Sequence, residues 1–269
     1  MRIAFSTLGC PTWSWQEILA AATDMKIQGI EVRGIQNQMY APKTAPLKNG
    51  ALKKTLEDMK RVGLVFSMMS AGCEIADKEN NNAVMGEMFD YIDLAQKCGC
   101  KYVRVMAEST PHMSRDVDLD YTLGVYKDIL DYAKDKNVFP LMETNGIFAS
   151  SKVMSNFIES TNRDNAGVLW DIHHPFRFFG EDVEATYDNL RGMIKYVHIK
   201  DSVMKDSKVE YRMLGYGDVP LVDAIGCLQN DGYDGFLSLE WLKRWTPDLE
   251  DPGIVFSHYV FYMRYLLEQ

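Results

Sequence analysis

Residues 167–171 read Gly-Val-Leu-Trp-Asp, a short apolar run that ends on the carboxylate of Asp171. The same pattern recurs where Glu143 ends Val-Phe-Pro-Leu-Met-Glu, His198 ends Tyr-Val-His and Glu240 ends Phe-Leu-Ser-Leu-Glu. Along the chain these four residues are separated by 28, 27 and 42 residues, about the length of a strand and its following helix. If the runs are successive parallel strands, the four side chains lie at the same strand ends and converge on one point.

Apolar runs of this kind are dispersed evenly and predict eight strands, at residues 3–7, 30–33, 64–69, 102–106, 139–143, 168–171, 196–199 and 236–240. Between them, apolar residues recur at helical spacing, as in 52–62, and a last helix is expected over 253–267. No Gly-x-Gly-x-x-Gly follows the first run, and no stretch is rich enough in Pro, Gly or Ser to mark a linker. The sequence therefore predicts an α/β protein, a closed (β/α)₈ TIM barrel formed as one domain over residues 1–269.

Glycines stand between several predicted helices and the next strand. Gly29, Gly63 and Gly99 each lie in such a junction. A left-handed residue commonly ends a helix, and glycine adopts that conformation at no steric cost. These three glycines are therefore expected to be helix C-caps that lead into short return loops.

The composition narrows the class of partner. Against 38 acidic residues there are 29 basic ones, and the resulting net charge of −9 weakens the case for nucleic-acid binding. The five cysteines are scattered, which is consistent with incidental thiols in a reducing cytosol. No apolar run approaches a membrane span, and the N-terminal run is too short for a signal peptide. We expect a cytoplasmic protein with a small-molecule substrate, no nucleic-acid partner and no membrane association.

The four strand-end residues combine carboxylate and imidazole donors. Mixed oxygen and nitrogen ligation suits one divalent ion, Mn²⁺, Mg²⁺, Co²⁺ or Zn²⁺, and differs from a thiolate-type structural zinc site. The alternative is that each acid simply pairs with a basic residue at the barrel rim. His174, three residues beyond Asp171, is expected in the loop past the strand and is interpreted as a substrate contact or a support for the metal ligands, with a fifth ligand as the other reading.

Five sequence blocks resemble the signatures of the xylose isomerase-like TIM barrels: Glu143-Thr-Asn145, Trp170-Asp-Ile-His-His174, Val197-His-Ile-Lys-Asp201, Leu214-Gly-Tyr-Gly-Asp-Val-Pro220 and Leu239-Glu-Trp241. In addition, Gly29-Ile-Glu-Val-Arg33 resembles the usual end of the second strand. The superfamily includes sugar phosphate isomerases and epimerases, ketose 3-epimerases, hydroxypyruvate isomerase, inosose dehydratase and endonuclease IV. The blocks keep their order, so the resemblance spans nearly the whole chain.

The resemblance implies roles for individual residues. It assigns the binding of one divalent ion to the following four residues: Glu143, Asp171, His198 and Glu240. It further implies that His174 and Arg212 contact substrate, and that Lys200 and Asp201 act in the site directly, support its residues or anchor a loop. Trp13 and Trp241 lie beside predicted strand ends, where they would either stack on a sugar face or belong to the core. A homo-oligomer is a further expectation from the resemblance.

The resemblance implies an isomerase or epimerase that acts on a sugar or related polyol. Removing a proton beside a carbonyl gives an enediolate, and Glu143 and Glu240 are expected to serve as base and acid on opposite sides of it. No evident cluster of Lys and Arg marks a phosphate pocket, so an unphosphorylated substrate is preferred, although a helix N-terminus can bind phosphate without one.

Three alternatives compete with this prediction. An inosose dehydratase-like lyase shares the metal and the proton abstraction, and a non-catalytic sugar-binding barrel needs no chemistry. An endonuclease would need further histidines after the third and fourth strands, where the sequence reads Phe66-Ser-Met-Met-Ser70 and Val105-Met-Ala-Glu-Ser109. The lack of histidine in both segments, together with the net charge, argues against DNA repair and favours a single metal ion.

Overall fold

The computed structural model describes residues 1–113 and 116–268. In this described part, parallel strands are neighbours in the order β1-β10-β7-β6-β5-β4-β3-β2, and this order closes into a barrel. The strands are β1 (Arg2–Ser6), β2 (Gly29–Val32), β3 (Val65–Glu74), β4 (Tyr102–Met106), β5 (Phe139–Glu143), β6 (Gly167–Asp171), β7 (Ile194–Ile199) and β10 (Phe236–Leu239). The predicted fold class, a (β/α)₈ TIM barrel, is confirmed.

The chain divides into two compact units. Unit 1 comprises Met1–Ser67 and His198–Gln269, and unit 2 comprises Met68–Val197. No helix of the described residues is both long and apolar enough to span a membrane.

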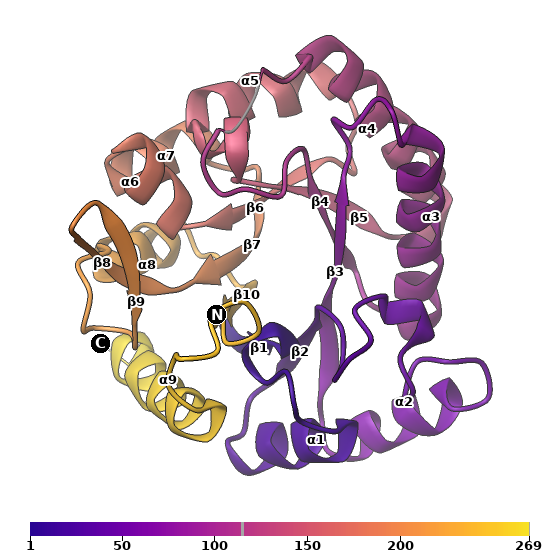
Figure 1. The fold of residues 1–269 in the computed structure, drawn as a ribbon, viewed down its shortest axis with the longest axis vertical. Helices are drawn as coiled ribbons and strands as arrows, with labels where there is room; N and C mark the ends of the chain where they lie inside the picture. The colour runs from indigo at the N-terminus through magenta and orange to yellow at the C-terminus, as the bar shows by residue number, and fades with distance from the viewer. Residues whose placement is uncertain (114–115, 269) are drawn as a thin grey trace. The chain divides into compact units, whose positions relative to one another are not determined.

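Unit 2 is a run of parallel strands with helices on its outer side. Its β5 pairs with β4 on one edge and with β6 on the other, and Val103 and Met142 on these strands are fully buried. The helices of this unit are α3 (Asn81–Cys98), α4 (Leu119–Ala133), α5 (Ser151–Thr161), α6 (His173–Phe179) and α7 (Val183–Leu190). In Figure 1, α3, α4 and α5 lie outside the strands, so the carboxyl ends of β5 and β6 remain available for polar side chains.

In unit 1, β1 lies between β10 and β2 and is parallel to both. The helices are α1 (Trp15–Asp24), α2 (Leu52–Arg61), α8 (Leu221–Asn230) and α9 (Pro252–Leu267), and the short 3-10 helix η1 (Thr7–Gly9) directly follows β1. A capping box starts α1, because the Ser14 side chain accepts from the Glu17 N–H while the Glu17 carboxylate accepts from the Ser14 N–H. Phe5 of β1 stacks on Phe256 of α9, which packs that helix on the sheet.

The predicted strands are all present, with ends that differ by a few residues. The third extends to Glu74, and Glu240 lies one residue beyond β10. Sequence reasoning missed a hairpin of β8 (Asp201–Lys205) and β9 (Lys208–Arg212), which forms its own antiparallel pair. Turn residues Asp206 and Ser207 both have positive φ, and neither is glycine, so the usual hairpin signal is missing.

The prediction that three glycines are left-handed caps holds for two of them. Gly63 and Gly99 have φ values of 72° and 65°. Gly29 is instead the first residue of β2, and the prediction for it was wrong. A Cβ on Gly29 would lie 2.7 Å from the Phe236 ring and 2.8 Å from the Ser67 Cβ, so this position needs glycine for close packing.

Candidate functional site

In unit 2, Glu143 and Asp171 are the last residues of β5 and β6, and both are buried. Arg104 on β4 holds the first of them: its Nη1 donates to Glu143 Oε2 at 3.3 Å. Arg104 Nε and Nη2 donate to the Ala71 carbonyl at 3.2 and 2.9 Å. A guanidinium held at both edges is a rigid support, so the Glu143 carboxylate is oriented before any ligand binds.

Asp171 is fixed by its neighbours in unit 2. Its backbone N–H donates to Thr144 Oγ1 at 2.8 Å, and its Oδ1 accepts from the His173 N–H at 3.0 Å. His174 Nδ1 lies 3.0 Å from the Thr144 carbonyl, and its Nε2 lies 3.7 Å from Asp171 Oδ2. Because a carbonyl only accepts, Nδ1 carries the proton and Nε2 faces the carboxylate.

His174 differs in position from the sequence prediction. It lies in the short helix α6 rather than in an irregular loop. Asp171, His173 and His174 are all buried and offer ligand atoms within 4.8 Å of one another, so the first turn of this helix adds donors beside the strand end. Its role as a substrate contact stays a prediction.

In unit 1, His198 on β7 lies in a network of buried polar side chains. Its Nε2 is 2.9 Å from Glu31 Oε2, and the same oxygen accepts from Ser238 Oγ at 2.8 Å. A carboxylate can only accept, so Nε2 of His198 carries a proton and Nδ1 presents its lone pair. His198 Nδ1 lies 3.8 Å from Glu240 Oε1, on the side where a metal ion would bind.

Glu240 is positioned from two directions. Its backbone N–H donates to the Ile199 carbonyl at 3.1 Å, which continues the strand pairing past β10. Its Oε2 accepts a hydrogen bond from Nζ of Lys200, which is itself fully buried. A buried ammonium beside a buried carboxylate offsets its charge and fixes its orientation. Lys200 therefore contacts a predicted site residue directly.

Glu31 contacts the predicted ligand His198, and the sequence had indicated no role for it. Its block, Gly29-Ile-Glu-Val-Arg33, was singled out only as a strand end. Its position inside an apolar run could have indicated a role, because a carboxylate is costly to bury unless hydrogen-bond donors contact it. Its donors, His198 and Ser238, lie on distant strands, so they could not be read from local sequence.

We expect Glu31→Gln to weaken divalent-metal binding by about 10- to 100-fold, because a neutral amide holds the His198 N–H less strongly than a carboxylate. Calorimetric titration of Mn²⁺ measures this. Glu57→Gln makes the same chemical change on an exposed face of α2 and is the control. Unchanged Mn²⁺ affinity in Glu31→Gln, with the ¹⁵N shifts of His198 also unchanged, would contradict the role.

Asp201 anchors the loop that contains Gly215 and Gly217. Its two carboxylate oxygens accept four backbone N–H groups, those of Ser202, Gly215, Gly217 and Val219. Burial raises the pKa of the Asp201 carboxyl, and the four N–H donors act in the opposite direction. A Cβ at Gly217 would lie 2.0 Å from Asp201 Oδ1, so the second glycine of the block is needed for this approach.

The remaining predicted substrate contacts lie in three different surroundings. Arg212 ends β9, where its guanidinium pairs with Glu210 and donates to the Tyr211 carbonyl. Trp241 is 1% exposed and its indole N–H donates to the Glu250 carbonyl at 3.1 Å, whereas Trp13 is partly exposed and packs edge-on against Phe256. The substrate role of each stays a prediction, and of the two tryptophans Trp13 has the more accessible ring.

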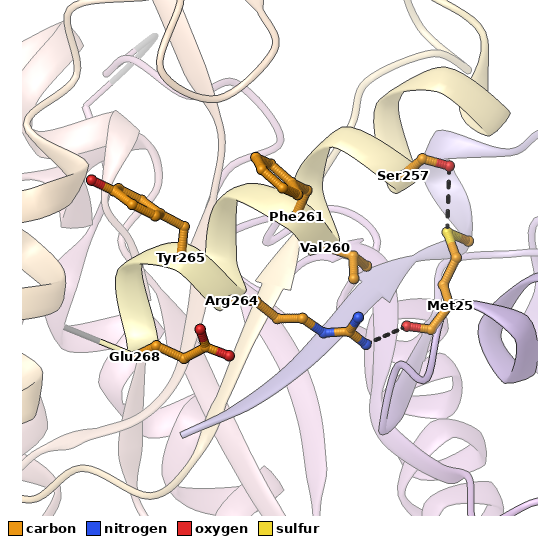
Figure 2. A pocket seen from close by; sticks show the side chains of 7 residues that line it. All are labelled: Met25, Ser257, Val260, Phe261, Arg264, Tyr265 and Glu268. Atoms are coloured by element: carbon orange, nitrogen blue, oxygen red, sulfur yellow. Dashed lines mark hydrogen bonds between the residues drawn. The ribbon is translucent and has the colours of Figure 1, made fainter.

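A surface pocket of about 470 Å³ lies along α9, lined by Met25, Ser257, Val260, Phe261, Arg264, Tyr265 and Glu268 (Figure 2). Arg264 Nη2 donates to the Met25 carbonyl at 2.8 Å across one end of this pocket. None of the predicted site residues line it. The pocket is therefore separate from the polar networks of His198 and Glu240.

Comparisons with known proteins agree on the fold. Residues 19–254 match the family described as Xylose isomerase-like TIM barrel. A Streptomyces coelicolor protein with the provisional name hydroxypyruvate isomerase is 25% identical over 237 residues, which cover 86% of this chain and 76% of that protein.

Two solved structures extend the comparison. The IolI protein with a bound zinc atom has a TM-score of 0.82 at 16% identity, covering 100% of this chain and 99% of that one. An L-ribulose 3-epimerase has a TM-score of 0.79 at 19% identity, covering 99% and 94%. At these identities the two structures show the fold alone. Because the family match covers well over half of the sequence, the chain belongs to the Xylose isomerase-like TIM barrel family.

Proposed function

We propose that this protein is a divalent-metal-dependent isomerase or epimerase, and that Glu143, Asp171, His198 and Glu240 bind its metal ion. The observation that carries the proposal is that each of these residues offers one ligand atom, and these atoms lie within 4.8 Å of one another. Their exposed fractions are 1%, 0%, 0% and 4%. The relative named as a hydroxypyruvate isomerase supports the reaction class, and the zinc-bound IolI structure supports a metal in this fold.

The donor set fits a divalent cation. Three carboxylates that bind one ion repel one another unless cations offset their charge. Arg104 pairs with Glu143 and Lys200 pairs with Glu240, which supplies two positive charges. Oxygen donors with one imidazole suit Mn²⁺, Mg²⁺, Co²⁺ or Zn²⁺. When bound, the ion would act as a Lewis acid on the carbonyl and hydroxyl oxygens of the substrate.

The side chains divide the work of proton transfer. Arg104 holds Oε2 of Glu143, and Lys200 holds Oε2 of Glu240, so each carboxylate is oriented with its Oε1 as a second oxygen. We assign proton removal from the carbon beside the carbonyl to one of these glutamates and proton return to the other. Return to the same carbon on its other face gives an epimer, and return to the neighbouring carbon gives an isomer. Asp171 and His198 act as ligands only.

The substrate class follows from this chemistry. A chelating pair of carbonyl and adjacent hydroxyl oxygens is present in ketoses, aldoses and related hydroxy-carbonyl compounds. The L-ribulose 3-epimerase with the same fold acts on such a compound, as its name states. We therefore propose a sugar or a related small hydroxy-carbonyl compound as the substrate.

A screen by NMR in D₂O tests the proposal. Protein supplied with Mn²⁺ is incubated with ketoses, aldoses, inososes and hydroxypyruvate, and solvent deuterium at the exchanging carbon is followed together with new products. We expect deuterium incorporation and a product of unchanged composition apart from the label. Loss of water to give an enone or diketone would instead indicate a lyase. A protein that binds Mn²⁺ without exchanging any of these compounds would argue against an enediolate reaction on them.

A further inference from the structure

Arg244 lies in the loop between β10 and α9, four residues beyond Glu240. Its backbone N–H donates to the Leu8 carbonyl at 3.2 Å, and Leu8 belongs to η1, directly after β1. Because β1 and β10 are parallel neighbours, both segments lie at the carboxyl ends of their strands. Active sites of barrels of this class lie at that end of the strands, so Arg244 belongs to the functional face of unit 1.

The guanidinium of Arg244 has donors without acceptors. Its Nε and Nη2 are buried and have no hydrogen-bond partner among residues 1–113 and 116–268. Burial lowers the pKa of Arg244, and the acidic group that acts on it is the Cys10 thiol. Burial also raises the pKa of Cys10, so this thiol is uncharged at neutral pH and does not neutralise Arg244. The charge of Arg244 is therefore uncompensated in the described part of the chain.

Two neighbouring cations are already engaged. Lys200 pairs with Glu240, and Lys243 donates to the carbonyls of Pro247 and Leu249, which holds the loop in its present shape. Trp241 adds a third anchor through its bond to the Glu250 carbonyl. The loop is thus fixed by its other side chains, and Arg244 is not needed to hold it together.

We propose that Arg244 binds an anionic oxygen group of the ligand, a carboxylate or a phosphate. Such a group supplies both the missing acceptors and the missing negative charge, and the planar Nε–Nη2 edge of a guanidinium matches two oxygens of either group. The side chain of Arg244 is partly exposed, so an anion can approach it from the solvent. This inference rests on the proposed function, which assigns the hydroxy-carbonyl group of the substrate. It adds an acidic group, so the substrate is an acidic hydroxy-carbonyl compound rather than a neutral sugar.

The preference for an unphosphorylated sugar or polyol followed from the absence of an evident Lys and Arg cluster in the sequence. A single guanidinium whose Nε and Nη2 are buried can replace such a cluster, because an unpaired cation with little water around it attracts an anion more strongly than fully exposed cations do. The carboxylates of Glu31 and Glu240 in the same unit would repel an acidic substrate, and the positive charge of Arg244 would offset part of that repulsion.

Anion binding to metal-free protein tests this inference without any turnover. Trp245 is 57% exposed and adjoins Arg244, so tryptophan fluorescence reports the titrations. The probes are inorganic phosphate, glycolate and, as the neutral counterpart of glycolate, ethylene glycol, all at constant ionic strength. The variants are Arg244→Gln, Arg244→Lys and, as a control with the same loss of charge on α9, Arg264→Gln.

We expect saturable binding of phosphate or glycolate that weakens about tenfold or more in Arg244→Gln, weakens less in Arg244→Lys and is retained in Arg264→Gln. Preference for phosphate over glycolate identifies a phosphorylated substrate, and the reverse preference identifies a carboxylic acid. Circular dichroism confirms that each variant is folded. Equal anion affinity in wild type and Arg244→Gln, or no saturable binding of either anion to wild type, overturns the inference. Since no reaction is measured, a failed isomerase assay leaves this result unaffected.

Discussion

Replacement of Glu143 or Glu240 by glutamine is expected to reduce C–H exchange of a turned-over substrate in D₂O by about 10³-fold. An amide cannot take the proton from carbon, and the loss of charge also weakens the stabilisation of the developing enediolate. Both residues are buried and each is held by a cation, so glutamine fits the space without leaving a cavity. NMR measurement of deuterium incorporation, normalised to bound Mn²⁺, gives the effect of each substitution.

The two variants also distinguish the roles of the two glutamates. If they act on opposite faces of the substrate, each variant blocks exchange most strongly for the epimer whose proton faces the missing base. Glu159→Gln makes the same chemical change on the exposed face of α5 and should leave the rate unchanged. Undiminished exchange in both Glu143→Gln and Glu240→Gln, with Mn²⁺ bound, would contradict the proposed mechanism.

Removal of the metal is expected to abolish activity and to lower stability together. A ligand that binds only the folded state stabilises it by about 4 kcal/mol when its concentration is a thousand times its dissociation constant. The proposed ligands are far apart in the sequence, from Glu143 to Glu240, so the unfolded chain does not hold them together and binding favours the folded state. We expect dialysis against a chelator to reduce turnover to background and to lower Tm by several degrees, with both restored by Mn²⁺.

Asp171→Ala supplies the matched control for this experiment. The variant lacks a ligand carboxylate, so Mn²⁺ should raise its Tm much less than that of the wild type, whatever the general effect of added salt. Metal analysis of the purified protein identifies the ion that co-purifies. Full turnover by protein that contains no divalent ion would exclude the metal-dependent mechanism while leaving the fold assignment intact.

The predicted strands were found because a buried parallel strand is recorded locally, as an apolar run of a few residues. Its ends were less well placed where tertiary contacts extend the pairing, as at the third strand, which continues to Glu74. Gly29 shows a second kind of error. Its position between a helix and a strand suggested a left-handed cap, but the reason for glycine there is the Phe236 ring, which packs against it from a strand far along the chain.

The strand pattern and the four metal-competent side chains can be read from the sequence alone, because strand length, helix period and ligand chemistry are local properties. The partner of each buried charge depends on the tertiary structure. Glu31 and His198 are 167 residues apart, and their hydrogen bond depends on the pairing of distant strands. The hydrogen bond between Arg104 and Glu143 and the lack of a partner for Arg244 Nε and Nη2 among the described residues likewise depend on tertiary contacts. Burial removes water as a hydrogen-bond partner, so the energy of a buried charge depends on the protein groups around it.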